Sequence, residues 1–352
     1  MSNANESSAK LSSELSSTSV PKTAVPEPGP DWKTAKLEWG VAWEFHCYGL
    51  GVAFAFLAIN SVAAMVLANK KKAFARRVFF DAINSLQVLF GMSRALCLLI
   101  DPYESKMNIA NCPVWIARPL FGIAFPCLTS SFCLIHLAFL EVAKVQLVPP
   151  KIQNFKVVVS IIGLHFLVVI VSDTTVAFEG NLTELLIVCQ SFFIVWGFLN
   201  SISFMYSGSK VVSQARKIQR QLLAIQQGEN RKEAPKSNSS HVCSKTSKVA
   251  KITLATSALG VACCSLQVYS LFGVYGMYSK VVNPKPWPWL AFQTSFRLVE
   301  LAMGCTIAYS VLQSADRGQH LLHLKSCFRS RVNRIKFNIV PFNGNPIANT
   351  PC

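Results

Sequence analysis

Seven apolar stretches of membrane-spanning length constrain this chain more than any other feature. A helix needs about 20 mainly apolar residues to cross a hydrocarbon core about 30 Å thick, and seven segments of the 352-residue sequence meet that requirement. Their length excludes buried strands. The predicted fold class is therefore an all-α membrane protein, a seven-transmembrane helix bundle. We expect spans at about 43–68, 78–100, 113–143, 157–178, 185–209, 252–279 and 287–313.

Basic residues are distributed unevenly between the segments that connect these spans. Of the 34 Lys and Arg residues, 24 lie in the odd-numbered loops and the C-terminal tail, seven lie in the N-terminal tail and the even-numbered loops, and three lie inside spans. Short cytoplasmic loops are enriched in Lys and Arg, which predicts an N-terminus outside and a cytoplasmic C-terminus. The net charge of +17 then reflects topology and attraction to anionic lipids at the cytoplasmic face, and nucleic acid is not needed to explain it.

The chain divides by composition into a bundle and its flanking segments. Residues 1–38 are rich in Ser and then Pro, which predicts a disordered extracellular tail, and residues 39–314 form the seven-helix membrane domain. Export of the tail would depend on the first span acting as a signal anchor; alternatively, the natural chain has more sequence upstream. The sequons at Asn5 and Asn181 are candidate glycosylation sites on the lumenal side.

Two further segments have a basic, cytoplasmic character. Residues 210–250 form a basic loop, and its first part, 210–228, has apolar residues at helical spacing. That part is expected to bind anionic lipid or a cytoplasmic protein partner, or else to be a solvated extension of the fifth span. Residues 315–352 form a basic tail with an interfacial helix, in which Cys327 is a candidate palmitoylation site.

Polar residues recur at helical spacing within three of the spans. Together with small residues at the same spacing, they form three sets: Asp81, Asn84, Gln87, Gly91 and Arg94 in the second span, Gln293, Arg297, Glu300 and Gly304 in the seventh, and His46, Gly49, Ala53 and Asn60 in the first. Residues at such spacing share one helix face, so we expect these faces to point at each other. Asp81 is expected to pair with Arg76 or Arg77 near the helix end.

Ionisable groups inside spans are unfavourable in lipid and are functional candidates by default. With a rise of about 1.5 Å per residue, several lie at similar depth in the outer half. The candidate intramembrane polar cluster consists of Glu44, His46, Arg94, Arg118, Arg297 and Glu300. Its three arginines and two acids leave an excess positive charge that suits a small anionic ligand, such as a carboxylate or phosphate. Alternatively, these charges lock helices together and Arg118 reaches lipid headgroups.

Other polar and helix-breaking residues favour simpler interpretations. His136 and His165 have no second ligand at helical spacing, so we expect core histidines rather than a metal site. Pro119 and Pro126 predict a kink in the third span. The sequence contains no Ser/His/Asp arrangement, phosphate loop or HExxH motif, and we expect neither an enzyme nor a bound cofactor.

Four stretches of the bundle carry a family resemblance. They are EWGVAWEFHCYGLG, SRALCLLIDPYESK, PCLTSSFCLIHLAFLE and FRLVELA. They resemble the C-terminal membrane domain of the proline-rich transmembrane protein 3 and 4 family, over about residues 39–314. The resemblance implies seven spans and an orphan function. The long Pro-rich extracellular region of that family is reduced here to PKTAVPEPGP.

These features together predict an orphan multi-pass protein of receptor-like topology in the plasma membrane. We expect it to sense a signal or act as a scaffold at the cell surface. One alternative is a transporter or channel with an intramembrane Arg/Glu site, and another is a non-signalling adhesion or trafficking scaffold.

Overall fold

Seven helical stretches of membrane-spanning length make up the bundle. A computed structural model describes residues 29–70, 77–105, 113–143, 155–178, 184–228, 238–274 and 284–337. Within these ranges, seven stretches are long and apolar enough to cross a membrane: Val41–Asn69, Arg77–Ile100, Val114–Ala138, Lys156–Phe178, Ile187–Lys210, Lys251–Phe272 and Pro286–Gln313. The all-helical class and the number of spans predicted from the sequence are thus confirmed.

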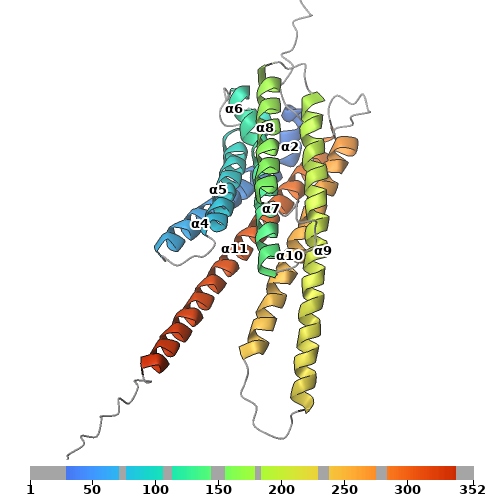
Figure 1. The fold of residues 1–352 in the computed structure, drawn as a ribbon. Helices are drawn as coiled ribbons and strands as arrows, with labels where there is room; N and C mark the ends of the chain where they lie inside the picture. Colours follow the sequence, from blue (N-terminus) through green and yellow to red (C-terminus); the bar gives the residue numbers. More distant parts are fainter. Residues whose placement is uncertain are drawn as a thin grey trace, which may run out of the picture.

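Helices of very different length build these spans. The elements are α2 (Trp32–Trp39), α3 (Val41–Glu44), η1 (Phe45–Gly49), α4 (Leu50–Lys70), α5 (Arg77–Ile100), η2 (Pro102–Glu104), α6 (Val114–Gly122), α7 (Ala124–Ala143), α8 (Phe155–Phe178), α9 (Glu184–Gly228), α10 (Asn238–Tyr269), η3 (Ser270–Val274) and α11 (Pro286–Phe337). With 45, 32 and 52 residues, α9, α10 and α11 exceed the about 20 residues that a bilayer requires. They continue past the other helices at the lower end of the bundle (Figure 1). The upper end, which carries α2, is called the α2 end below.

Neighbouring helices in the chain pack mainly against one another. Helix α4 packs on α5, α9 on α10, and α10 on α11, whereas α7 packs on α5 and α6 packs on α8. Large apolar side chains such as Ile59, Leu167 and Leu199 are exposed on the outside of the bundle. Apolar surface on a membrane helix faces lipid, so this exposure agrees with a multi-pass membrane protein.

The third span is broken in its first half, as the prolines predict. Helix α6 ends at Gly122 and α7 begins at Ala124, with a turn at Ile123 between them. Pro126 has no N–H to donate to the carbonyl of Gly122, four residues earlier. The predicted kink is confirmed, and it leaves backbone carbonyls near the break available to side chains from other helices.

The first span differs from its predicted register because η1 is a π-helix. Its buried face after His46 runs through Leu50, Phe54 and Ser61, one residue later than the predicted Gly49, Ala53 and Asn60. Asn60 is exposed and donates to the Phe56 carbonyl of its own helix. A π turn accommodates one extra residue, and this insertion rotates the rest of α4 relative to the regular 3.6-residue spacing. The predicted position of Asn60 on the inner face is therefore wrong.

Helices α4 and α5 approach closely at Gly91. A Cβ at this position would lie 2.8 Å from the Phe54 carbonyl oxygen and 3.0 Å from the Ala58 Cβ. Backbone cannot yield as a flexible side chain can, so a larger residue must push the helices apart. The contact brings α5 into the position from which Arg94, one turn further on, points into the bundle.

We expect Gly91→Ala to destabilise the protein by about 1–3 kcal/mol through overpacking. Gly163→Ala is the matched control, because a Cβ at Gly163 would meet no atom within 4 Å. The thermal unfolding midpoint of the purified protein in detergent measures the difference. Equal midpoints for the two variants would contradict the close approach.

Candidate functional site

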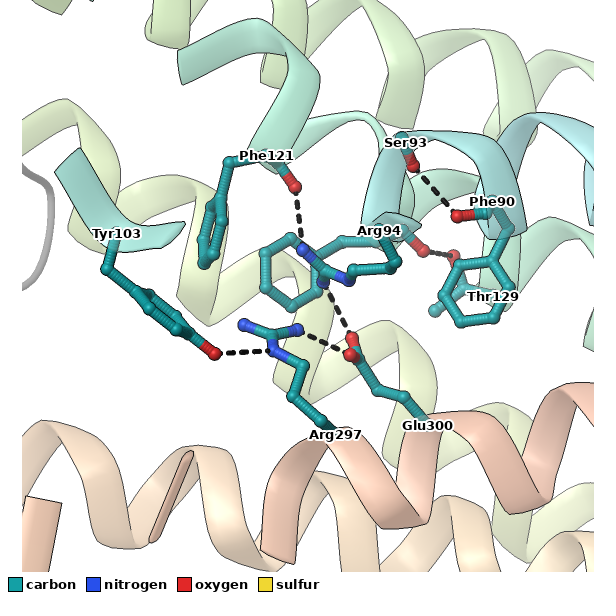
Figure 2. A network of polar contacts seen from close by, with 9 residues as sticks. Phe90, Ser93, Arg94, Tyr103, Phe121, Thr129, Arg297 and Glu300 are labelled. Carbon is teal, nitrogen blue, oxygen red and sulfur yellow. Dashed lines mark hydrogen bonds and ion pairs between the residues drawn. The ribbon is translucent and has the colours of Figure 1, made fainter. Parts of the chain in front are cut away.

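A buried ionic triad joins two helices at the α2 end. The Glu300 carboxylate accepts a hydrogen bond from Arg94 Nη2 at 2.7 Å through Oε1, and its Oε2 accepts one from Arg297 Nη1. Exposure of the three side chains is between 0% and 2%. Both guanidinium groups thus share one carboxylate, as Figure 2 shows.

Local helix geometry places each member of the triad. Arg297 and Glu300 lie three residues apart on α11, a spacing that brings side chains together on one helix face. Arg94 reaches them from α5, and its Nη1 donates to the Phe121 carbonyl at 3.0 Å. Phe121 lies at the end of α6, beside the break in the third span. The triad therefore links α5 and α11 to the kink.

Aromatic rings surround the two guanidinium groups. The Arg94 guanidinium carbon lies 4.9 Å from the centre of the Phe121 ring and 4.7 Å from that of Phe125. The corresponding distance from Arg297 to the Phe121 ring is 5.1 Å. Such cation–π contacts strengthen when water is excluded, so the rings offset part of the unfavourable burial of these charges.

Tyr103 connects the triad to His46. Its hydroxyl oxygen accepts a hydrogen bond from Arg297 Nε at 3.2 Å and lies 3.0 Å from His46 Nε2. His46 Nδ1 lies 2.8 Å from Thr294 Oγ1. Because arginine only donates, the Tyr103 hydroxyl hydrogen is available to His46 Nε2. This arrangement favours the tautomer of His46 that carries its hydrogen on Nδ1 and donates to Thr294.

Tyr103 also has an unusual backbone conformation. Its φ of 56° and ψ of 34° lie in the left-handed region, which costs a residue with a side chain about 1–3 kcal/mol. The surrounding contacts must compensate for this strain. Strained residues are common at functional sites. Here the left-handed backbone places the Tyr103 hydroxyl between Arg297 of α11 and His46 of the first span.

Aromatic rings cluster at the α2 end and reach the triad through Tyr103. This aromatic cap consists of Trp32, Trp39, Trp43, Trp289 and Tyr103. Trp39 of α2 stacks on Trp289 of α11 with ring centres 5.8 Å apart and planes at 16°, and Trp289 lies 5.1 Å from Tyr103. The cap thus joins α2 to α11, about two helical turns before Arg297.

A hydrogen bond from Lys36 connects α2 to the segment that follows α5. Its ammonium group donates to the Ser105 carbonyl at 3.0 Å, next to the short η2 segment. Partial burial lowers the pKa of Lys36 below its usual value, an effect that the Asp101 carboxylate opposes. The contact fixes α2 over the loop that carries Tyr103.

Arg118 lies apart from the triad. It is buried on α6 and interacts with Asp173 of α8, a described acid that is also buried. The Asp173 carboxylate lies so close to Gly122 that a Cβ there would overlap with it. Asp173 was not among the predicted site residues. An acid within the fourth span could have indicated a partner for the arginine of the third span, but the packing of α6 on α8 is a tertiary feature.

The structure brings together some of the predicted site residues and separates or leaves undescribed the others. The structure brings His46, Arg94, Arg297 and Glu300 together, but Glu44 is exposed and lies outside this buried group. Asn5 and Asn181 lie outside the described residues, and for Cys327 only the helical backbone is described. Tyr103 was not among the predicted site residues, although it lies in the quoted DPY sequence.

The two isolated histidines are core residues, as expected. His136 Nε2 lies 3.1 Å from Ser207 Oγ of α9, and its ring stacks on Phe204 with centres 4.3 Å apart. His165 Nδ1 lies 3.1 Å from Thr129 Oγ1 of α7. Each hydrogen bond joins two helices.

The fold and its buried charges define a multi-pass helical membrane protein. Comparison with known proteins agrees, because residues 17–333 match the proline-rich transmembrane protein 3 domain. The chain belongs to this family. No solved structure matches it.

Relatives with curated descriptions are distant. Human proline-rich transmembrane protein 4 is 27% identical over 134 residues, which are 38% of this chain and 14% of the relative. The mouse protein of the same name is 29% identical over 100 residues, which are 28% of this chain and 11% of the relative. The matched part of this chain thus spans about a seventh of the relatives' length or less.

We expect Glu300→Gln to destabilise the protein by about 3–5 kcal/mol, because it leaves two buried arginines without their shared carboxylate. Asp81→Asn is the control, since Asp81 pairs with Arg77 at 3.3 Å on a largely exposed surface, where a pair contributes about 0–1 kcal/mol. The stability of each variant is measured by its thermal unfolding midpoint and by the amount of protein at the cell surface. Similar losses in the two variants would argue against a buried triad.

Proposed function

We propose that this chain is a non-enzymatic cell-surface protein of receptor-like topology that senses a signal or acts as a scaffold at its outer end. In this proposal the aromatic cap lies outside, and the extensions of α9, α10 and α11 lie in the cytoplasm. The localisation that follows is the plasma membrane. The family membership and the seven candidate spans support the general architecture.

The observation that carries this proposal is the continuity of α11. One helix contains Trp289 of the cap, then Arg297 and Glu300 of the triad, and runs on to Phe337. Its first turns contact α2 through the stacked indoles. A displacement of the cap therefore acts on the same helix that leaves the bundle at the other end (Figure 1).

Charge distribution supports the proposed orientation. Lys210, Arg216, Lys217 and Arg220 are exposed on α9 as it passes its span. Basic side chains at this end favour the cytoplasmic side, where they would contact anionic lipid headgroups or an acidic partner protein at 210–228. The tail around Cys327 lies on the same side in this arrangement, which suits palmitoylation.

A transporter or channel is the second candidate. It is favoured by polar side chains buried between α7, α8 and α9, namely His136, His165, Thr129, Asn200 and Ser207. A path for a solute would have to link this polar region to the triad. The burial of Glu300 and Arg297 supports a closed bundle with the charges locking helices, so we rank this candidate second.

Orientation is tested by epitope tags on the two termini and by glycan mapping. We expect an N-terminal tag to be accessible to antibody on intact cells and a C-terminal tag only after permeabilisation, because the basic loops stay in the cytoplasm. Sequon variants Asn5→Gln, Asn181→Gln and Asn238→Gln locate any glycan. A glycan at Asn238 would overturn the proposed orientation.

Coupling through α11 is tested with Tyr103→Phe, which keeps the ring and removes the hydroxyl that joins Arg297 and His46. Labels introduced as unnatural amino acids near the ends of α9 and α11 report the distance between the two extensions. We expect the distance distribution to shift or broaden, because rearranged contacts at one end of a rigid helix move its other end.

The control for this experiment is Tyr309→Phe, which removes an exposed hydroxyl of α11 that binds only Gln313 among the described residues. It should leave the distance distribution unchanged. A folded Tyr103→Phe variant with the wild-type distribution would contradict sensing through α11 and favour a scaffold.

A further inference from the structure

Asn60 is a polar side chain on the exposed side of the first span. Exposed apolar residues, among them Phe56 and Val66, lie on both sides of it along α4. The span Val41–Asn69 has its midpoint five residues before Asn60, so Asn60 lies about 7.5 Å from that midpoint along the helix axis. Half the thickness of a hydrocarbon core is about 15 Å. The amide therefore faces the hydrocarbon core and not the headgroups.

The fold leaves part of the hydrogen-bonding capacity of Asn60 unused. An asparagine amide has two N–H donors and a carbonyl oxygen that accepts. Among the described residues, this side chain makes one hydrogen bond, from its Nδ2 to the Phe56 carbonyl at 3.0 Å. A second N–H and the Oδ1 acceptor remain, and a polar group without a partner is strongly unfavourable in hydrocarbon. A partner that both donates and accepts would satisfy both groups.

Helix α4 has one face that the bundle does not cover. Among the described helices it packs chiefly on α5 and α11. Its other side carries a line of exposed residues spaced by four, three and four: Phe56, Asn60, Ala63 and Leu67. Residues at such spacing share one helix face, and the small Ala63, one turn after Asn60, allows a neighbouring helix to approach closely.

A second copy of this chain provides the complementary group. Copies of one protein are inserted into a membrane in the same direction, so a twofold axis that relates two of them runs along the membrane normal. Such an axis places each residue of the line opposite its own counterpart at the same depth. The two Asn60 amides then face each other, and each donates to the oxygen of the other. An amide is self-complementary in this way, whereas a side chain that only donates is not.

We propose that the exposed face of α4 is a homodimer interface, in which the Asn60 side chains of two copies exchange hydrogen bonds within the hydrocarbon core. Phe56 and Leu67 pack on either side of this pair. Helices in lipid associate through polar side chains and close packing of small residues, and this face offers both. The dimer goes beyond the proposed function, because it depends neither on the aromatic cap nor on coupling through α11.

The test uses the full-length chain, labelled with a donor or an acceptor fluorophore on a C-terminal tag and reconstituted together into phosphatidylcholine vesicles. Energy transfer is recorded while added lipid dilutes the protein. We expect the transfer to follow a monomer–dimer dissociation curve, because association depends on the number of copies per lipid. Transfer no greater than that of randomly distributed labels at every dilution overturns the proposal.

Asn60→Leu keeps the approximate size of the side chain and removes the amide. It should weaken the dimer about tenfold or more, since two hydrogen bonds between helices are lost, and Asn60→Gln, which retains an amide, should dissociate less readily than Asn60→Leu. Ser265→Ala on α10 is the matched control, because Ser265 is also exposed and donates to a carbonyl four residues earlier in its own helix. A wild-type dissociation curve for Asn60→Leu overturns the proposal.

A bulky substitution locates the interface independently. Ala63→Trp places an indole on the line of contact and should also weaken the dimer about tenfold or more, because the two helices could no longer approach closely. Val195→Trp introduces the same ring on α9, where Val195 is 59% exposed, and should keep the wild-type curve. Unchanged dimerisation in Ala63→Trp, or its loss in Val195→Trp, overturns an interface on α4.

Discussion

The sharing of one carboxylate by two arginines in a low-dielectric interior is the interaction on which the α2 end depends. Glu300 holds Arg94 of α5 and Arg297 of α11, and Arg94 also binds the carbonyl of Phe121 at the broken third span. Removing Glu300 leaves two buried arginines without their shared carboxylate, where water cannot reach them. The triad therefore specifies how three separate helices meet.

The aromatic cap and the strained Tyr103 are built on this ionic centre. Tyr103 adopts a left-handed conformation that its hydrogen bonds to Arg297 and His46 compensate, and its ring contacts Trp289. The cap and the triad are thus connected through Tyr103, and Trp39 of α2 is buried against Trp289 of α11.

Much of this arrangement follows from residues that the sequence makes visible. Arg94, Arg297 and Glu300 are costly in lipid unless they meet, and their depths already match. Pro119 and Pro126 indicate the kink through the missing N–H. Glu44 and Asp173 show the limit of this reasoning: both are acids near span ends, yet Glu44 is exposed and Asp173 is buried beside Gly122. Sequence distance does not indicate which acid a neighbouring helix will cover.

Hydrophobic length and the cost of charge in lipid are properties of each segment alone, so the class of protein, the seven spans and the joint burial of Arg94, Arg297 and Glu300 could be predicted without a structure. Three features became visible in the structure: the π turn that shifts the first span by one residue, Tyr103 as the link between His46 and Arg297, and Asp173 as an acid beside Arg118. These depend on helix rotation and on which helices are neighbours, which are set by packing between segments far apart in the chain.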